Sequence, residues 1–320
     1  MQGLVTVFGG SGFLGVQVVR ALAKSGHRVR VAVRRPSLAY RMRMLGDVGQ
    51  IEIVQANIRN PDSVARALAG AQGAVNLVGV LYESGRQKFD AIHVEGAGNV
   101  AKAATAAGVE RLAHISAIGA DAASPAKYAQ TKAAGEAAVL AAFPGATILR
   151  PSVVFGPEDA FFNRFGQLSA LAPVLPLFGG GKTLFQPVYA VDVAAAVVSA
   201  LGSASAPGAV YELGGPGIYS FKALLELICR ETGHHPLLLP IPFPVASLLG
   251  AVGDLTSVIV PPFLTADQVT LLKRDNIVST GALTLADLGV TPTAVEAIVP
   301  TYLYRYRKGG QYADAIANGI

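Results

Sequence analysis

Tyr128 and Lys132 are the residues of this 320-residue chain whose types and spacing point most directly to chemistry. Side chains four positions apart lie on one face of a helix, so the phenol and the ammonium come together there. The lysine charge lowers the pKa of the tyrosine, which can then act as a general acid or base, and the lysine can also hydrogen-bond a ribose. Such a pair is common by chance, so its place in the fold decides its meaning.

A glycine-rich segment near the start of the chain predicts a dinucleotide site. It follows an apolar run directly and opens a helical pattern. Its first glycine permits a tight turn, its third lets the backbone approach a pyrophosphate, and its last lets the helix pack closely on the strand. The N–H groups and the dipole of the helix then bind phosphate. The alternative is a purely structural turn. The expected contacts are Gly9, Ser11, Gly12, Phe13, Leu14 and Gly15.

The end of the second expected strand indicates which dinucleotide binds. A site for an unphosphorylated ribose has Asp or Glu about 20 residues after the glycines. This chain has Arg34 and Arg35 instead, with no acid nearby. Because an arginine pairs with the 2′-phosphate of NADP, we expect NADP(H) rather than NAD(H). The alternative is a solvated basic loop, since Arg41 and Arg43 follow.

Two further places suit the same cofactor. Asn57 and Ile58 follow the third expected strand, where they can meet the adenine ring. Leu77, Val78 and Gly79 end the fourth, where a small residue lets the ribose approach.

Strands and helices alternate through the first 150 residues. The expected strands are residues 4–8, 29–33, 51–54, 74–80, 112–116 and 146–149, and the expected helices are 12–24, 61–68, 89–107 and 128–141. This rhythm predicts an α/β fold with a Rossmann-type doubly wound parallel sheet. Proline and glycine become frequent after Pro151. We therefore expect an NADP(H)-binding Rossmann domain at 1–150 and a smaller, loop-rich C-terminal lobe at 151–320, packed on the first domain as a cleft or docking side.

The composition excludes several classes of protein. Hydrophobic residues make up 52% of the chain, which argues against disorder. The net charge of +5 is too diffuse to predict nucleic-acid binding. The single cysteine, Cys229, excludes an intrachain disulfide and a Cys-based zinc site. His93, His114, His234 and His235 lack the spacing of metal ligands, so we expect no metal and treat them as packing or surface residues.

Neither end nor interior suggests a membrane span. The first apolar run is too short for a signal peptide, and the apolar piece at 245–253 is far short of the roughly 20 residues that span a bilayer. That piece belongs to a charge-poor stretch, residues 232–266, which is either buried core or a docking surface. The aromatic, basic run at 302–308 is either a solvated helix end or a contact with lipid headgroups or a partner.

With these residues the chain resembles the extended and atypical short-chain dehydrogenase/reductase superfamily of NAD(P)-dependent epimerases and dehydratases. The resemblance continues through residues 149–157 and 187–194, which adds Pro151 and Val154 to the implied cofactor contacts, together with Ser116, Tyr128 and Lys132.

A narrower resemblance runs nearly the whole chain. Residues 155–159, 163–165, 186–189, 264–269 and 272–278 look like the nucleotide-binding accessory subunit of respiratory complex I and its bacterial relatives. That family implies a tightly held NADPH and a place among other complex I subunits, where the peripheral arm meets the membrane. It implies a peripheral location on the cytoplasmic face of a bacterial inner membrane, or on the matrix side in mitochondria. It does not imply turnover.

One departure from the superfamily pattern bears on activity. The superfamily has paired small hydroxyl residues at the end of the fifth strand, and the second of them is catalytic; here the pair is Ser116 and Ala117. Ser116 is a weak substitute. We therefore expect an accessory subunit with little turnover. The alternative is an active NADP-dependent oxidoreductase or nucleotide-sugar epimerase or dehydratase, in which Tyr128 and Lys132 are catalytic.

Overall fold

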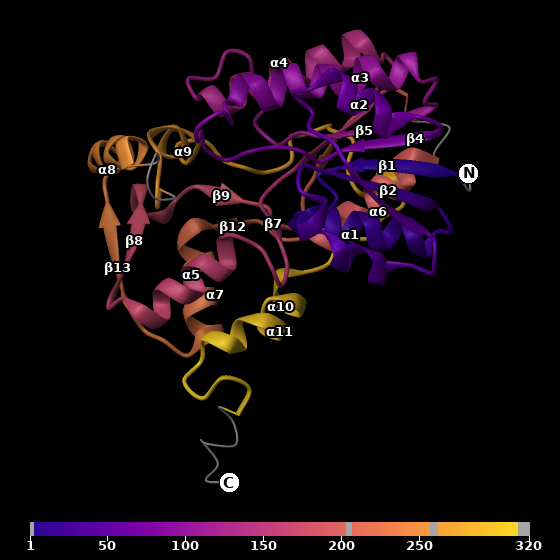
Figure 1. Ribbon diagram of the computed structural model, residues 1–320. Helices are drawn as coiled ribbons and strands as arrows, with labels where there is room; N and C mark the ends of the chain where they lie inside the picture. Colours follow the sequence, from indigo (N-terminus) through magenta and orange to yellow (C-terminus); the bar gives the residue numbers. More distant parts are fainter. Residues whose placement is uncertain (1–2, 203–206, 257–261, 313–320) are drawn as a thin grey trace. The chain divides into compact units, whose positions relative to one another are not determined.

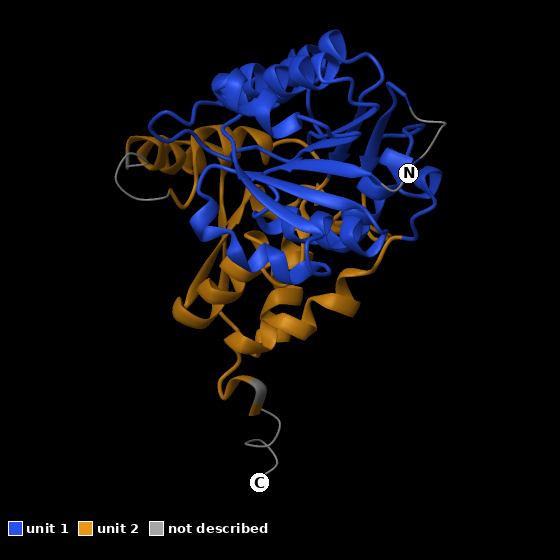
Figure 2. Ribbon diagram, turned by 45° about the vertical axis from the view of Figure 1, so that its right-hand side comes forward, with its two compact units in different colours: residues 1–151, 190–213, 278–291 blue, residues 152–189, 214–277, 292–320 orange. Residues whose placement is uncertain are grey.

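The computed structural model describes residues 3–202, 207–256 and 262–312. They form two compact units, and the chain passes between the units several times (Figure 2). The first unit comprises residues 1–151, 190–213 and 278–291, and the second comprises residues 152–189, 214–277 and 292–320. The sequence suggested one boundary after residue 150. The first segment of the first unit does end at Pro151, but two later segments return to that unit.

A seven-stranded parallel sheet forms the centre of the first unit, in the order β11-β6-β5-β4-β1-β2-β3 (Figure 1). Its strands are β1 (Leu4–Phe8), β2 (Arg28–Val33), β3 (Ile51–Gln55), β4 (Gly73–Asn76), β5 (Arg111–Ile115), β6 (Thr147–Pro151) and β11 (Val210–Leu213). The strand order reverses between β1 and β4, and open α/β sheets bind ligands outside the carboxyl ends at such a point. The predicted doubly wound α/β fold is confirmed, and β11 is a strand that the sequence analysis did not predict.

Helices cover both faces of this sheet. Figure 1 shows α2, α3 and α4 on one face and α1 and α6 on the other. The helices are α1 (Phe13–Lys24), α2 (Pro61–Leu68), α3 (Ala97–Ala106), α4 (Lys127–Ala142) and α6 (Ala190–Gly202). Because both faces are covered, the central strands carry apolar side chains on each side, and Val5, Val7, Val29 and Val31 are at most 2% exposed.

Two expected elements differ from the structure near the carboxyl edge of the sheet. The helix expected at 89–107 is divided into a π-helical segment, η3 (Asp90–Gly96), and α3. The strand expected at 74–80 ends at Asn76, so residues 77–79 lie in the loop that follows. Sequence periodicity does not distinguish a π-helical turn from an α-helical one.

The second unit consists of short elements around an aromatic core. Its strands pair in twos: β7 (Val154–Phe155) with β10 (Val188–Tyr189), β9 (Leu184–Phe185) with β12 (Tyr219–Ser220), and β8 (Val174–Phe178) with β13 (Leu237–Ile241). Its helices are α5 (Phe161–Leu171), α7 (Phe221–Thr232), α8 (Phe243–Thr256), α9 (Ala266–Leu271), α10 (Val295–Ile298) and α11 (Pro300–Leu303). Phe155, Phe162 and Phe221 lie at the centre of the core, each at most 2% exposed.

Asp159 forms hydrogen bonds with three parts of the second unit. Its carboxylate accepts hydrogen bonds from the backbone N–H of Gly156 (3.1 Å), from the backbone N–H of Phe162 (2.6 Å) and from the hydroxyl of Tyr302 (2.6 Å). Burial raises the pKa of Asp159, and the bonds that it accepts oppose that rise. The carboxylate therefore links the start of α5 to α11.

Replacing Tyr302 by Phe should lower the free energy of unfolding by about 1.5–3 kcal/mol, because it removes a buried hydrogen bond to a charged group. Tyr304→Phe is the matched control: this side chain is 38% exposed, and we expect a change within about 0.5 kcal/mol. Urea denaturation of both variants measures the difference. Equal midpoints for Tyr302→Phe and the parent would show that the Asp159 contact does not stabilise the fold.

Part of the aromatic, basic run at 302–308 is built into the second unit. Arg305 donates to the carbonyl of Pro157, and Arg307 donates to the carbonyl of Glu231. Tyr304 and Lys308 are exposed, and the predicted contact with a lipid or a partner requires outward residues of this kind.

None of the described helices combines the length and hydropathy that a bilayer-spanning segment needs. Residues 257–261 of the charge-poor stretch lie outside the described residues.

Candidate functional site

The glycine-rich segment forms the turn between β1 and α1, at the carboxyl edge of the sheet. Gly9 has a φ of +79°, which favours glycine, and its carbonyl accepts the N–H of Gly12 at 3.1 Å. A Cβ on Gly15 would lie 2.3 Å from the Gly9 oxygen, so a larger residue would clash. No side chain caps α1. The N–H groups of its first turn therefore suit an anion such as a phosphate.

Arg34 and Arg35 follow β2 and are exposed. Nη1 of Arg34 donates to Oε1 of Gln87 at 2.9 Å, and Nη1 of Arg59 donates to the carbonyl of Arg86 at 2.8 Å. The guanidinium groups of Arg34 and Arg59 thus bind two neighbouring residues of one loop, Gln87 and Arg86. In the described part of the chain, Arg34 and Arg35 form no ion pair with a carboxylate. Their positive charges suit the binding of a phosphate.

Ile58 and Asn57, the two residues predicted to meet an adenine ring, differ in how far their side chains are buried. Ile58 is 4% exposed, and its side chain belongs to the core of the first unit. Asn57 is half-buried, and its Oδ1 accepts the backbone N–H of Arg59 at 3.2 Å. A contact at this position would therefore use the backbone or Asn57 rather than the Ile58 side chain.

The loop after β4 lies against the glycine turn, because β1 and β4 are neighbours in the sheet. A Cβ on Gly9 would lie 3.2 Å from Cγ2 of Val78. Gly79 is exposed, and a Cβ there would lie 3.7 Å from both Nζ of Lys132 and Nε2 of His93. The structure thus places the glycine turn beside the 77–79 loop, and this loop beside Lys132.

Tyr128 and Lys132 lie one turn apart near the start of α4. Lys132 is 5% exposed, and its Nζ donates to the carbonyl of Ile115 at 3.0 Å, at the end of β5. Burial lowers the pKa of Lys132 to about 8, although Glu136 raises it. Lys132 therefore carries a positive charge at neutral pH, next to the carboxyl edge of the sheet.

A buried ion pair holds α4 in place. Glu136, 5% exposed, accepts two hydrogen bonds from Arg150, from Nε at 2.9 Å and from Nη2 at 2.6 Å. Nη1 of Arg150 also lies 3.7 Å from Glu212 on β11. No local motif marks this ion pair in the sequence, because its members are far apart in the chain.

Ser116 and Ala117 follow β5. The Oγ of Ser116 is buried without a hydrogen-bond partner among the described residues. Buried hydroxyl groups of folded proteins almost always have a partner, so this one suits a bound ligand. Ala117 is less buried than Ser116, and it supplies no hydroxyl group at the second position.

Pro151 and Val154, the remaining predicted cofactor contacts, lie in different units. Pro151 ends β6 of the first unit, and Val154 begins β7 of the second. Their contact with a cofactor stays a prediction. Across the described residues, no group of three or more His, Cys, Asp or Glu side chains is arranged to hold a metal ion.

His93 is a residue of this region that the sequence analysis assigned to packing. It is 2% exposed, and it lies between the loop after β4 and α4. No sequence signal marks it, because its partners, Val80 and Thr131, are 13 and 38 positions away.

The second unit carries an exposed apolar helix face. On α8, the side chains of Leu248 and Leu255 are 69% and 81% exposed. Val245, Leu249 and Val252 are also exposed, and the spacing of these residues puts them on one side of the helix. A solvated helix has polar residues on its outer side, so this face suits a contact with another molecule.

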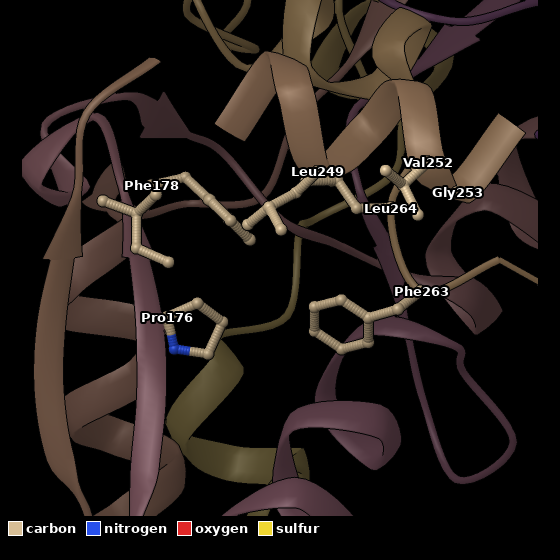
Figure 3. A pocket seen from close by; sticks show the side chains of 8 residues that line it. Pro176, Phe178, Leu249, Val252, Gly253, Phe263 and Leu264 are labelled. Atoms are coloured by element: carbon tan, nitrogen blue, oxygen red, sulfur yellow. The ribbon is translucent and has the colours of Figure 1, made fainter. Parts of the chain in front are cut away.

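A pocket of about 380 Å³ lies beside α8 within the second unit (Figure 3). Leu249 and Val252 of α8 line it, together with Pro176 of β8 and with Phe263. The guanidinium of Arg164 lies 4.5 Å from the centre of the Phe263 ring. The pocket is thus apolar, with a cation close to its lining.

The chain is similar to several known proteins. The model of the NAD-dependent epimerase/dehydratase family matches residues 5–214. The mitochondrial NADH dehydrogenase (ubiquinone) 1 alpha subcomplex subunit 9 of Arabidopsis thaliana is 37% identical in an alignment 320 positions long, which covers 97% of this chain and 80% of the relative. A ceramide reductase of Caulobacter vibrioides is 35% identical over 198 residues, which cover 62% of this chain and 61% of the relative. A dTDP-glucose 4,6-dehydratase from Streptomyces venezuelae, solved with NAD bound, matches with a TM-score of 0.71 at 19% identity, covering 96% of this chain and 98% of that one.

Proposed function

The chain belongs to the NAD-dependent epimerase/dehydratase family, and from this we propose that it is an NADP(H)-binding accessory subunit of respiratory complex I. In this proposal it stabilises the assembly and turns over little or no substrate. It works at the cytoplasmic face of a bacterial inner membrane, or on the matrix side in mitochondria, among subunits near the junction of the peripheral arm and the membrane.

The apolar outer face of α8 is the observation that carries the proposal. It lies beyond residues 5–214, the part that the family model matches, so a nucleotide site of this family does not account for it. The similarity to the Arabidopsis complex I subunit covers 97% of the chain and so includes this region. A subunit that docks on a larger complex buries such a face.

The carboxyl edge of the first unit has the groups that NADP(H) needs. The open N-terminus of α1 suits the pyrophosphate, and Arg34 and Arg35 suit the 2′-phosphate. Lys132 and Tyr128 can hydrogen-bond the nicotinamide ribose, and the buried hydroxyl of Ser116 lacks a described partner. The bound nucleotide supplies hydride-transfer chemistry.

Tyr128 and Lys132 do not by themselves imply an enzyme, because both side chains can also serve to bind the ribose. Ala117 removes the hydroxyl that would orient a substrate beside Tyr128. A tightly bound nucleotide with a structural role fits this combination.

We expect NADPH bound to the chain to be oxidised far more slowly than the ~10 s⁻¹ of an ordinary enzyme. A panel of quinones, aldehydes and nucleotide sugars, followed at 340 nm, measures this. Ala117→Ser, which restores the second hydroxyl, is the matched variant. Steady turnover by the parent that Tyr128→Phe abolishes would instead establish an enzyme.

The second candidate is an active NADP-dependent reductase, or a nucleotide-sugar epimerase or dehydratase. The specific observation in its favour is the intact Tyr128–Lys132 pair on α4, with Lys132 buried and charged. The similarity to a ceramide reductase, which spans 62% of the chain, also supports it.

Purification of the tagged chain at its native expression level, in mild detergent, distinguishes the two candidates. Mass spectrometry of the co-purifying proteins should identify complex I subunits in near-stoichiometric amounts. A chain that purifies alone and turns over a substrate would support the reductase or epimerase.

A further inference from the structure

His93 connects the loop after β4 to the helix that carries the Tyr-Lys pair. The backbone N–H of Val80 donates to Nε2 of His93 at 3.1 Å. On the other side of the ring, Nδ1 lies 3.1 Å from Oγ1 of Thr131. Thr131 lies between Tyr128 and Lys132 in the sequence of α4, so one buried ring joins two of the segments that form the candidate nucleotide site.

These partners fix the tautomer of the ring. A backbone N–H can only donate, so Nε2 must accept and carries no proton. In the neutral ring the proton is then on Nδ1, which donates to Thr131. The Thr131 hydroxyl can in turn donate to a backbone carbonyl in the first turn of α4. Burial, and then the charge of Lys132, lower the pKa of His93 to about 3, which keeps the ring neutral.

Ring packing also holds His93 in place. The ring of Tyr128 meets His93 edge-on, with 5.4 Å between the ring centres and 90° between the planes. Phe89 stacks on His93 with 5.3 Å between the ring centres, and its ring also meets that of Tyr128 edge-on at 5.9 Å. A Cβ on Gly135 would lie 2.0 Å from the carbonyl oxygen of His93, so this glycine lets α4 press against η3 at this point.

The His93 ring lies close to both Gly79 and Lys132. A Cβ on Gly79 would be equally far, 3.7 Å, from Nε2 of His93 and from Nζ of Lys132. His93 therefore stands next to the place where the loop after β4 meets the lysine. It belongs to a π-helical segment, and such segments are frequent at functional sites.

We propose that His93 is a positioning residue for the nicotinamide half of the nucleotide. Its ring bonds Val80 on one side and Thr131 on the other. It thereby fixes the loop that includes Gly79 relative to α4, the helix that carries Tyr128 and Lys132. The proposal rests on the proposed binding of NADP(H). The hydrogen bonds of the His93 ring go to Val80 and Thr131, and its ring contacts go to Phe89 and Tyr128, so its effect should be confined to one half of the ligand.

Two ligands separate this role from a general effect on folding. NADPH contains both halves, whereas 2′,5′-ADP contains the adenosine half with its 2′-phosphate. His93→Phe keeps an aromatic ring against Tyr128 and Phe89 but removes both hydrogen bonds. We expect it to weaken NADPH binding by about tenfold and to leave 2′,5′-ADP binding unchanged, as measured by calorimetry.

Two further variants serve as rescue and control. His93→Gln places an amide oxygen at about the reach of Nε2, so it should recover most of the NADPH affinity through the bond from Val80. His27→Phe changes another buried histidine, 9% exposed, which precedes β2 at the opposite edge of the sheet. It should leave the binding of both ligands unchanged.

The possible results decide between the explanations. A parent protein that binds 2′,5′-ADP and NADPH poorly would overturn the proposed nucleotide site, and the role of His93 with it. A parent that binds NADPH tightly, with His93→Phe affecting both ligands equally or neither, would overturn the positioning role while leaving the nucleotide site intact. Nitrogen-15 NMR of the parent gives a test that needs no variant: Nδ1 of His93 should carry the proton at pH 7, and a proton on Nε2 would contradict the bond from Val80.

Discussion

Replacing Arg34 by Ala should weaken NADPH binding by about tenfold to a hundredfold and leave NADH binding unchanged. The arginine loses a charge-assisted bond to the 2′-phosphate, worth about 1.5–3 kcal/mol, and NADH has no phosphate at that position. Arg34 is exposed, and Nη1 is the guanidinium nitrogen that bonds Gln87, so the group has further donors for a ligand. Arg35→Ala should act in the same direction. Calorimetric titration with both nucleotides measures the effect.

Arg43→Ala is the control for this experiment. Its guanidinium lies 5.7 Å from the centre of the Tyr40 ring, in the same basic segment of the chain. It removes one positive charge from the region without removing either predicted phosphate ligand, so NADPH affinity should stay close to that of the parent. Equal affinity of the parent for NADPH and NADH would refute the assignment of NADP(H).

Replacing Leu248 and Leu249 by Ser should release the chain from complex I. A leucine buried on association contributes about 1.5–3 kcal/mol, so the pair contributes about 3–6 kcal/mol, or at least a hundredfold in Kd. Leu248 is 69% exposed, and Leu249, which also lines the pocket beside α8, is 48% exposed, so the substitutions should lower the stability of the isolated chain only modestly. Native electrophoresis of detergent extracts measures how much of the chain remains with the complex.

The double variant Met44→Ser with Val48→Ser is the control for the docking experiment. These side chains are 81% and 106% exposed in the first unit and have no predicted role at an interface. The control should stay with complex I. The Leu248 and Leu249 variant must still fold and bind NADPH for its release to count. If it remains fully associated, α8 is not the docking surface.

The sequence predicted the first unit well because its signals are local. Buried parallel strands are apolar runs, and turns between them are marked by glycine or proline, as at Gly26 and Pro61. β11 was missed because it is short and contains Glu212, whose charge Arg150 offsets from β6. That pairing is visible only in the folded chain. The two later segments of the first unit, residues 190–213 and 278–291, were also missed, because they join that unit only in the folded chain.

The residues of the candidate site likewise separate into those with a local sequence signal and those without one. The glycine turn, the arginines after β2 and the Tyr-Lys pair have fixed spacings, so the sequence could single them out as candidates. His93 and Glu136 act through partners that are distant in the sequence, so nothing in the sequence distinguished them from packing residues. The composition of α8 left core and docking surface open. The exposure of Leu248 and Leu255 excludes burial of this side of α8 in the core, which a helix spacing alone does not reveal, and its role as a docking surface stays a prediction.

The most direct test of a structural rather than catalytic role is complementation of a deletion strain with Tyr128→Phe. The quantity to measure is assembled complex I on a native gel, with NADPH content determined for each variant. The account predicts that complex I assembly is impaired in the deletion and is restored equally by the parent and by Tyr128→Phe. Normal assembly without the chain, or failure of a Tyr128→Phe variant that still holds NADPH, would contradict it.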